Sequence, residues 1–319
     1  MKILVTGGAG FIGSHIVDAL VVRGAEVSVL DNLSTGKRAN LNPGARFYHV
    51  DLLEKEKVAA VMAQERPRAI IHLAAQMDVR RSVAEPTFDA QVNLVGMLNL
   101  MEAARKHAVK RIVFASTGGA IYGEQQQYPC DESHPCHPLS PYGVTKLATE
   151  NYLYFYQAEY GIQFIALRYA NVYGPRQDPH GEAGVVAVFC GRLLTGQPCT
   201  IYGDGEQTRD YVYVGDVVQA NLAALERNIS GSFNIGTGTE TSVNQLYAMI
   251  ATMVSSREAP RHAQTRPGEQ RRSVIDAVRA QHELGWKPQT TLAAGLGETL
   301  EYFRRRFAST RYPVVPTVS

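Results

Sequence analysis

A tyrosine and a lysine four residues apart, in Tyr142-Gly-Val-Thr-Lys146, form the pattern with the clearest chemical meaning. Ser140-Pro141 just before them predicts a helix start, so both side chains would share one helix face. A tyrosine of pKa about 10 must shift by roughly three units, or about 4 kcal/mol, to ionise at neutral pH. One cation about 4 Å away supplies about that at an effective dielectric constant of 20. Tyr142 is therefore predicted to be a general base, activated by Lys146 and by any further positive charge, such as an oxidised nicotinamide ring.

Two hydroxyl side chains, Ser116 and Thr117, end an apolar run at 110–117 that predicts a buried strand. Open α/β sheets bind ligands at the carboxyl ends of their strands, so a hydroxyl there can hydrogen-bond a reacting alcohol. We therefore add Ser116 and Thr117 to Tyr142 and Lys146 as catalytic candidates. An exposed helical Tyr/Lys pair is the alternative, which this context disfavours.

A cofactor site is predicted by glycines at 7, 10 and 13, directly after an apolar run and before a helix pattern. Glycine permits a tight turn and lets the backbone approach a pyrophosphate, which helix N-terminal N–H groups then hold. Asp31 ends the second apolar run, at the spacing of a ribose contact, and its charge would repel the extra phosphate of NADP. The predicted cofactor is NAD, and a structural turn is the alternative.

Further cofactor contacts are predicted where the next strands end. Asp51 is placed to accept a hydrogen bond from an adenine amino group, or only to cap its own loop. Small residues at Ala74 and Ala75, followed by Gln76, would let the backbone run close to the cofactor.

The elements that must position these residues are six apolar runs, at 2–6, 26–31, 46–51, 69–75, 110–117 and 163–169, each separated by a segment that could be helical. Such alternation predicts a Rossmann-type, doubly wound parallel sheet of the α/β class, with a second, smaller α/β lobe. Helix and strand signals at 215–236 predict a return to the first sheet. The predicted domains are therefore discontinuous: residues 1–170 plus 215–238 bind NAD, and 171–214 plus 239–311 bind substrate.

The composition narrows the class of protein. The 319 residues are 45% hydrophobic and 19% charged with a net charge of +2, which disfavours disorder and a nucleic-acid partner. No stretch approaches the roughly 18 apolar residues of a membrane span, and no targeting signal is evident, so we expect a cytoplasmic protein. Cys130, Cys136, Cys190 and Cys199 are expected to be reduced. Cys130, His134, Cys136 and His137 lack the spacing of paired zinc ligands, so no metal is predicted.

Four motifs together resemble a known family: Thr6-Gly-Gly-Ala-Gly-Phe-Ile-Gly13, Ser116-Thr-Gly-Gly-Ala-Ile-Tyr-Gly123, Tyr142-x-x-x-Lys146 and Arg168-Tyr-Ala-Asn-Val-Tyr-Gly-Pro-Arg176. They are similar, in order over about residues 1 to 305, to the extended short-chain dehydrogenase/reductases, and among these to the UDP-glucose 4-epimerases. The resemblance implies an NAD-dependent 4-epimerase of a UDP-sugar, glucose/galactose or the N-acetyl forms, and a homodimer. A UDP-glucuronate 4-epimerase, another nucleotide-sugar oxidoreductase or dehydratase, and a non-catalytic NAD-binding protein are the alternatives.

The resemblance also implies residue roles. Tyr142 is the base, Lys146 also binds the cofactor ribose, and Thr117 lies beside the substrate. The similar dehydratases carry Asp-Glu after this threonine, whereas Gly118-Gly119 stand here, which disfavours dehydration. Ser273 would lie beside the sugar, where a large side chain would exclude an N-acetyl group.

The full predicted sets combine the residue patterns with this resemblance. The cofactor-binding set is Gly7, Gly10, Phe11, Ile12, Gly13, Asp31, Asn32, Ser34, Thr35, Gly36, Asp51, Leu52, Leu73, Ala74, Ala75, Gln76, Asn93, Tyr142, Lys146, Tyr169 and Val172. The substrate-binding set is Thr117, Asn171, Val186, Tyr202, Arg209, Arg266, Glu269 and Ser273.

Overall fold

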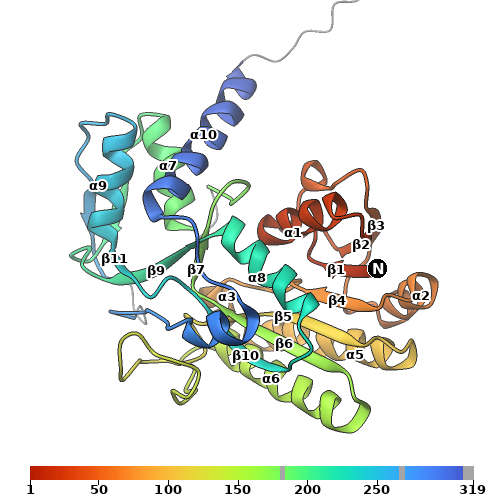
Figure 1. The fold of residues 1–319 in the computed structure, drawn as a ribbon. Helices are drawn as coiled ribbons and strands as arrows, with labels where there is room; N and C mark the ends of the chain where they lie inside the picture. The colour runs from red at the N-terminus through yellow and green to blue at the C-terminus, as the bar shows by residue number, and fades with distance from the viewer. Residues whose placement is uncertain (180–183, 266–269, 312–319) are drawn as a thin grey trace, which may run out of the picture.

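A seven-stranded parallel sheet with the strand order β10-β6-β5-β4-β1-β2-β3 forms the centre of the computed structural model, which describes residues 1–179, 184–265 and 270–311 (Figure 1). Its strands are β1 (Lys2–Thr6), β2 (Glu26–Asp31), β3 (Arg46–His49), β4 (Ala69–His72), β5 (Arg111–Thr117), β6 (Gln163–Tyr169) and β10 (Gly231–Ile235). The chain winds outward from β1 in both directions, so the crevice between β1 and β4 is the topological switch point where such sheets bind ligands. The predicted doubly wound α/β sheet is confirmed.

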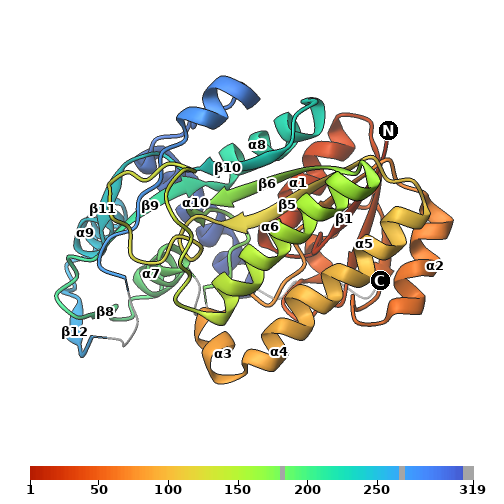
Figure 2. The ribbon, with the colours of Figure 1, turned by 90° about the horizontal axis from the view of Figure 1, so that it is seen from below.

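Helices cover both faces of this sheet (Figure 2). One face carries α1 (Phe11–Val22) and α8 (Val214–Glu226), and the other carries α2 (Lys55–Glu65), α5 (Gly96–Lys106) and α6 (Pro141–Tyr160). Within β1, Ile3 and Val5 pack into the first core and Leu4 into the second. Burial on both faces explains why the strands are apolar at successive positions.

Two strands end earlier than the sequence predicts. We expected strands at 46–51 and 69–75, but β3 ends at His49 and β4 at His72. After β4 the chain leaves the sheet as a loop at residues 73–78, here called the β4 loop. The predicted return to the first sheet is confirmed, because β10 pairs in parallel with β6.

In the described part of the chain, a second lobe is built from two small sheets and three helices, at the upper left of Figure 1. The sheets have the orders β11-β9-β7 and β12-β8. The elements are β7 (Asn171–Tyr173), α7 (Val185–Leu194), β8 (Thr200–Tyr202), β9 (Thr208–Tyr213), β11 (Glu240–Ser242), α9 (Val243–Met253), β12 (Arg261–Ala263) and α10 (Leu292–Arg311). Tyr173, Phe189 and Phe303 pack in their shared core.

The remaining elements are short. They are η1 (Arg38–Asn40), α3 (Val79–Ala84), α4 (Pro86–Ala90), the π-helical turn η2 (Gln91–Val95) and the π-helical turn η3 (Ala280–Leu284). The segments α4, η2 and α5 follow one another without a break, and π-helical turns within helices often mark functional positions. Within the described ranges, no helix combines the length and apolarity of a membrane span.

Candidate active site

The glycine-rich turn forms a tight cradle against the end of β4. A Cβ atom at Gly13 would lie 2.2 Å from the Gly7 carbonyl oxygen, and one at Gly7 would lie 2.7 Å from the backbone nitrogen of Ala74. The N–H groups in the first turn of α1 have no helical acceptors, and no acidic side chain occupies that turn. The cradle therefore fits a pyrophosphate, as in bound NAD. It comprises Gly7, Gly10, Phe11, Ile12 and Gly13, next to Leu73, Ala74 and Ala75.

Asp31, at the end of β2, joins the cradle to the next loop. Its Oδ2 accepts a hydrogen bond from the Ala9 nitrogen at 2.9 Å, and its Oδ1 accepts one from the Leu33 nitrogen at 2.8 Å. A carboxylate has about four acceptor positions, so about two are left for ribose hydroxyl groups. The loop with Asn32, Ser34, Thr35 and Gly36 folds over the cradle, because the Lys37 nitrogen donates to the Ala9 carbonyl oxygen at 2.9 Å.

Asp51 is held by its own surroundings. Its Oδ2 accepts a hydrogen bond from the Asn32 side chain at 2.7 Å, and its Oδ1 accepts one from the Leu53 nitrogen at 2.9 Å. Asp51 Oδ1 therefore caps its own loop, as the alternative interpretation predicts. Asp51 Oδ2 instead binds the loop that follows β2. Leu52 is buried in the second core.

Asn93 fixes the β4 loop from the π-helical turn η2. Its side-chain oxygen accepts a hydrogen bond from the Gln76 nitrogen at 2.8 Å, and its amide nitrogen donates to the Gln76 carbonyl oxygen at 2.9 Å. The Asn93 side-chain amide thus takes the place that the backbone of a neighbouring strand would have in a β-sheet. The β4 loop is therefore held where it passes the glycine cradle.

Tyr142 and Lys146 lie on one face of α6, as predicted. The helix begins after Ser140, whose hydroxyl accepts a hydrogen bond from the Gly143 nitrogen at 3.2 Å. The Lys146 ammonium group donates to the Ala115 carbonyl oxygen at 2.8 Å and lies 5.7 Å from the centre of the Tyr142 ring. The pair therefore lies beside the end of β5, and Lys146 is only 4% exposed.

Burial dominates the electrostatics of this pair. It raises the pKa of Tyr142 above its usual range, and the nearby negative charge of Asp89 adds to the rise. Desolvation lowers the pKa of Lys146 to about 8, although Asp89 and Glu150 both oppose that fall. Within the protein alone, Lys146 therefore does not outweigh the burial of Tyr142. We therefore expect the positive charge of an oxidised nicotinamide ring to favour ionisation of Tyr142.

The two hydroxyls that end β5 point to different places. Thr117 Oγ1 accepts a hydrogen bond from the Ala120 nitrogen at 3.2 Å, so it lies in the turn that begins beyond the strand. Ser116 Oγ donates to buried Glu150 at 2.5 Å. Successive side chains of a strand alternate between its faces, so the prediction that both residues serve catalysis needs correction. Only Thr117 is retained as a candidate.

A buried polar network beneath the pair was missed by the sequence analysis. Arg168 and Glu150 form an ion pair at 2.7 Å, and Ser232 donates to the same carboxylate at 2.7 Å. Arg168 also donates to the Tyr122 hydroxyl at 2.9 Å. The network fixes α6 against β5, β6 and β10. Its one sequence signal is spacing: Glu150 follows Lys146 by four residues and Tyr142 by eight, on the same helix face.

The substrate side of the candidate site is defined around Gly119. A Cβ atom there would lie 4.0 Å from Asn171 Oδ1 and 4.0 Å from Ser273 Oγ. Ser273 is held in place because its carbonyl oxygen accepts a hydrogen bond from the Asp210 nitrogen at 3.0 Å. Residues far apart in sequence, among them Asn171 and Ser273 of the predicted substrate-binding set, thus meet just beyond Thr117.

Two other residues of the predicted sets are buried. Val186 is 1% exposed in the core of the second lobe, and the Tyr169 hydroxyl is bonded to Asn221 at 2.8 Å. Tyr202 lies in β8, Arg209 in β9 and Val172 in β7. Arg266 and Glu269 lie outside the described residues.

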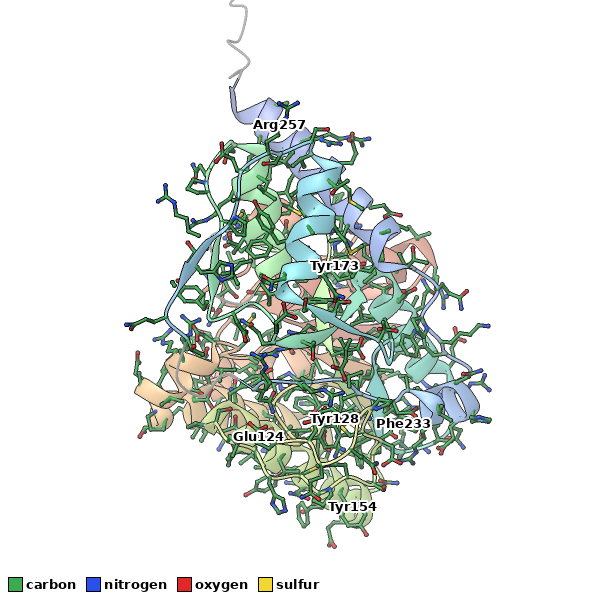
Figure 3. All side chains as sticks on the ribbon, turned by 90° about the vertical axis from the view of Figure 1, so that its left-hand side faces the viewer. Glu124, Tyr128, Tyr154, Tyr173, Phe233 and Arg257 are labelled. Atoms are coloured by element: carbon green, nitrogen blue, oxygen red, sulfur yellow. The ribbon has the colours of Figure 1, made fainter. Side chains whose placement is uncertain are left out.

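The Cys130–His137 segment is used for structure, in the loop that carries Glu124 and Tyr128 in Figure 3. His134 Nε2 accepts a hydrogen bond from the Gln126 nitrogen at 2.9 Å, and its Nδ1 lies 2.8 Å from the Pro135 carbonyl oxygen. Burial raises the pKa of the Cys130 thiol to about 12. No set of three or more metal-binding side chains gathers in the part of the chain that the structure describes.

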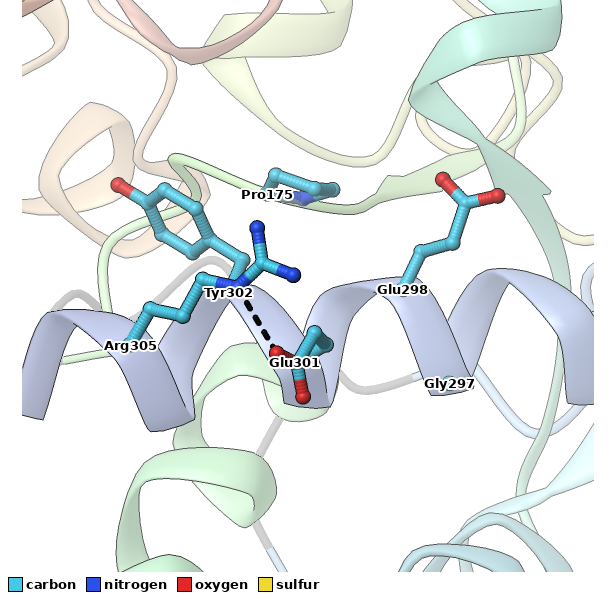
Figure 4. Close-up of a pocket in the computed structure, with 6 residues that line it drawn as sticks. All are labelled: Pro175, Gly297, Glu298, Glu301, Tyr302 and Arg305. Carbon is cyan, nitrogen blue, oxygen red and sulfur yellow. Dashed lines mark hydrogen bonds and ion pairs between the residues drawn. The ribbon is translucent and has the colours of Figure 1, made fainter.

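An open groove of about 470 Å³ lies elsewhere, between Pro175 and one side of α10 (Figure 4). Its charged side chains are already bonded: Arg305 binds Glu301, and Glu298 accepts a hydrogen bond from Tyr213. Tyr302 also lines this groove, but no lysine stands among its described lining residues, so the candidate site remains at the end of β5.

Comparison with known proteins places this geometry in a family. Residues 3–236 match the model of the NAD dependent epimerase/dehydratase family. The chain belongs to this family. The resemblance drawn from the four motifs is thereby confirmed, and the family match covers the cradle, the Tyr/Lys pair and β10.

Three members of the family are similar along nearly the whole chain. The UDP-glucose 4-epimerase of Mycolicibacterium smegmatis is 46% identical over 312 residues, which cover 96% of this chain and 99% of the relative. The structure of UDP-glucose 4-epimerase from Thermotoga maritima with UDP-glucose has a TM-score of 0.95 at 50% identity, covering 96% of this chain and 100% of that one. The Thermus thermophilus UDP-glucose 4-epimerase in complex with NAD has a TM-score of 0.91 at 48% identity, covering 95% and 99%.

Proposed function

We propose that the protein is an NAD-dependent 4-epimerase of a UDP-sugar. The observation that carries the proposal is the position of Tyr142 and Lys146 at the end of β5, on the same edge of the sheet as a glycine cradle that fits NAD. Family membership supports it, as do relatives of 50% and 48% identity whose structures contain UDP-glucose or NAD.

The reaction needs one proton acceptor beside the sugar. Tyr142, held as the phenolate by the positive charge of Lys146, takes the proton of the C4 hydroxyl group and becomes the neutral phenol. The Thr117 hydroxyl hydrogen-bonds the C4 oxygen as its charge changes. The glycine cradle and Asp31 would hold NAD, which would supply reversible hydride transfer at C4. Tyr142 returns its proton when the hydride returns to the sugar, and because the hydride is returned, the net redox change is zero.

The turn beyond β5 limits the chemistry to this one carbon. Elimination of water needs a further acid and base beside the ring, but Gly118 and Gly119 have no side chains. A Cβ atom at Gly118 would lie 2.6 Å from the Ile275 side chain, whereas one at Gly119 would point into the space between Asn171 and Ser273. The sugar ring is proposed to bind on this side of the turn, near Asn171 and Ser273, where it must turn over between the two hydride transfers.

We also propose that the two predicted domains bind different ligands. Residues 1–170 plus 215–238 hold NAD, and 171–214 plus 239–311 hold the UDP group, including Asn171 and Arg209. Tight binding of the diphosphate and uridine leaves the sugar free to turn. We also propose a cytoplasmic location. The four cysteines are free thiols, as expected in a reducing compartment.

The protein is further proposed to work as a homodimer that pairs through α6. Val144, Tyr152 and Phe155 lie on one side of this helix and are 50%, 38% and 47% exposed, and Tyr154 projects from the lower edge in Figure 3. Apolar side chains gathered on one helix face favour association. Sedimentation should give twice the chain mass of 35.0 kDa. Phe155→Glu should give a monomer, and an unchanged mass would show that α6 is not the interface.

A panel of UDP-sugars tests the proposed function directly. The purified protein is mixed with UDP-glucose, UDP-galactose, their N-acetyl forms or UDP-glucuronate, with and without added NAD, and the 4-epimers are measured by chromatography. Epimerisation without net formation of NADH is the expected result. Net NADH production, or no change in any sugar, would contradict an epimerase.

Asp31→Ala should weaken NAD binding about tenfold or more and narrow the preference over NADP. A hydrogen bond to a charged group contributes about 1.5 to 3 kcal/mol, and removing the carboxylate also removes its repulsion of the extra phosphate. Calorimetric titration of cofactor-stripped protein with NAD and NADP measures both effects. Asp31→Asn is the matched control, because its oxygen can still bind Ala9 or Leu33 while the charge is lost. A parent that binds NADP as tightly as NAD would remove Asp31 from this role.

A further inference from the structure

Asp89, in α4, is a fully buried carboxylate beside the Tyr142–Lys146 pair. Its Oδ1 accepts hydrogen bonds from the side-chain amides of Gln76 and Asn93, both at 3.0 Å. Its Oδ2 accepts a hydrogen bond from the Thr145 hydroxyl at 2.9 Å. A buried charge is costly unless it is hydrogen-bonded in this way, so the cluster is built around the carboxylate.

The three donors come from three segments of the candidate site. Gln76 belongs to the β4 loop, Asn93 to the π-helical turn η2, and Thr145 to α6, between Tyr142 and Lys146. The Thr145 hydroxyl also lies 3.0 Å from the Tyr142 carbonyl oxygen. Asp89 therefore connects the loop beside the cofactor cradle with the helical turn that carries the proposed base.

The charge of Asp89 is not cancelled by its direct partners, which are two amides and a hydroxyl. Glu150, the other carboxylate that acts on Lys146, instead binds the guanidinium group of Arg168 at 2.7 Å. The other charged groups on the segments around α4 have partners of their own. Arg81 binds Glu85, and the Asp78 side chain caps α3. The full set of these groups is Asp78, Arg80, Arg81 and Glu85. Among the described residues, the hydrogen-bond partners of Asp89 are thus neutral, and its negative charge acts on Lys146.

We propose that Asp89 is a positioning residue for the reaction proposed above, which holds Lys146 in its ammonium form and fixes the first turn of α6 against the β4 loop. Its negative charge raises the pKa of both Lys146 and Tyr142. Catalysis in the forward direction needs Tyr142 without its proton and Lys146 with its proton. Asp89 therefore sets the pH range in which the pair works, without touching the sugar.

Asp89→Asn tests this role, because asparagine has the same shape and can keep the cluster. Its oxygen can accept from Gln76 and Asn93, and its amide can donate to Thr145, which still reaches Tyr142. Loss of the charge lowers both pKa values. Both limbs of the kcat/KM profile should therefore move to lower pH, by roughly half to one pH unit. A merely structural role would lower the profile without moving its limbs.

A second readout does not depend on turnover. The ultraviolet absorbance of tyrosinate is followed against pH in the NAD-loaded protein, and the signal of Tyr142 is isolated by subtracting the same titration of Tyr142→Phe. The midpoint of the Tyr142 titration should move to lower pH in Asp89→Asn. For this variant, the titration that is subtracted is that of the double variant Asp89→Asn/Tyr142→Phe. Thr145→Val is the matched control, since it removes one hydrogen bond but keeps the charge, and its midpoint should equal that of the parent.

Unchanged midpoints in Asp89→Asn, by both measurements, would overturn the proposal, as would an equal shift in Thr145→Val. If Asp89→Asn does not fold, Asp89→Ser carries the same expectation with a smaller side chain. The tyrosinate titration also separates this proposal from the proposed function. A moved midpoint in a protein that epimerises no UDP-sugar would support the role of Asp89 and contradict the epimerase.

Discussion

Tyr142→Phe is expected to lower turnover of the UDP-sugar by about a hundredfold or more while the protein keeps its fold and its NAD. The substitution removes one hydroxyl group, and loss of a general base typically costs about 10²- to 10⁴-fold. The ring itself can stay, because its packing beside Lys146 does not need the oxygen. The measurements are kcat with saturating substrate, thermal unfolding and the amount of cofactor that copurifies.

Tyr156→Phe is the matched control for this experiment. Tyr156 lies in the same helix and is buried, but its hydroxyl donates to Glu102 at 2.8 Å, away from the end of β5. It should turn over substrate at close to the parent rate. If Tyr142→Phe also works within a few-fold of the parent, Tyr142 is not the base.

The fold was largely predictable because its signals are local. Each apolar run of the large sheet reports burial on two faces, and the helical segments between the runs force parallel strands. The strand ends were less predictable. Leu73 and Ala74 are as apolar as β4 itself, yet they leave the sheet to pass the glycine cradle, where small side chains are needed for close approach. Three-residue strands such as β8 and β12 contain too few residues for any periodicity.

The residues of the candidate site also differ in whether a local sequence signal marks them. Tyr142 and Lys146 could be found because one helical turn sets their distance, and the cradle because glycine spacing is itself the signal. Ser116 shows where the pattern was misread: alternation along β5 already implied that it faces away from Thr117. Asp89 could not have been found, since its partners Gln76 and Thr145 meet it only in the folded chain.

The burial of Tyr142 and Lys146 affects their charges in a way that their sequence spacing does not reveal. Burial works against ionisation of Tyr142 and against the charge of Lys146, so the pair is strongly responsive to nearby charge. Asp89 and Glu150 stabilise the ammonium group, and the positive ring of oxidised NAD would favour the phenolate. We therefore expect the base to become active only after the cofactor has bound.

The size of residue 273 should decide whether an N-acetyl group fits beside the sugar. Ser273 Oγ and Asn171 Oδ1 each lie 4.0 Å from the position of a Cβ atom at Gly119, and we expect the acetamido group of a bound sugar to lie beside residue 273. Overpacking a rigid pocket typically costs about 1 to 3 kcal/mol, or about 5- to 150-fold in binding. With serine here, we expect the parent to epimerise UDP-N-acetylglucosamine as well as UDP-glucose.

Ser273→Tyr should then suppress the N-acetyl reaction selectively, because the aromatic ring would occupy the space that the acetamido group needs while the smaller sugar still binds. The measurement is the ratio of kcat/KM for UDP-N-acetylglucosamine to that for UDP-glucose, which should fall about 5-fold to 150-fold. Ser273→Ala, which removes only a hydroxyl group, should leave the ratio near that of the parent. Ser273 is 4% exposed, so the tyrosine ring must extend toward the substrate side, and thermal unfolding checks that the variant keeps its fold. A folded Ser273→Tyr protein with an unchanged ratio would show that residue 273 does not line the sugar pocket.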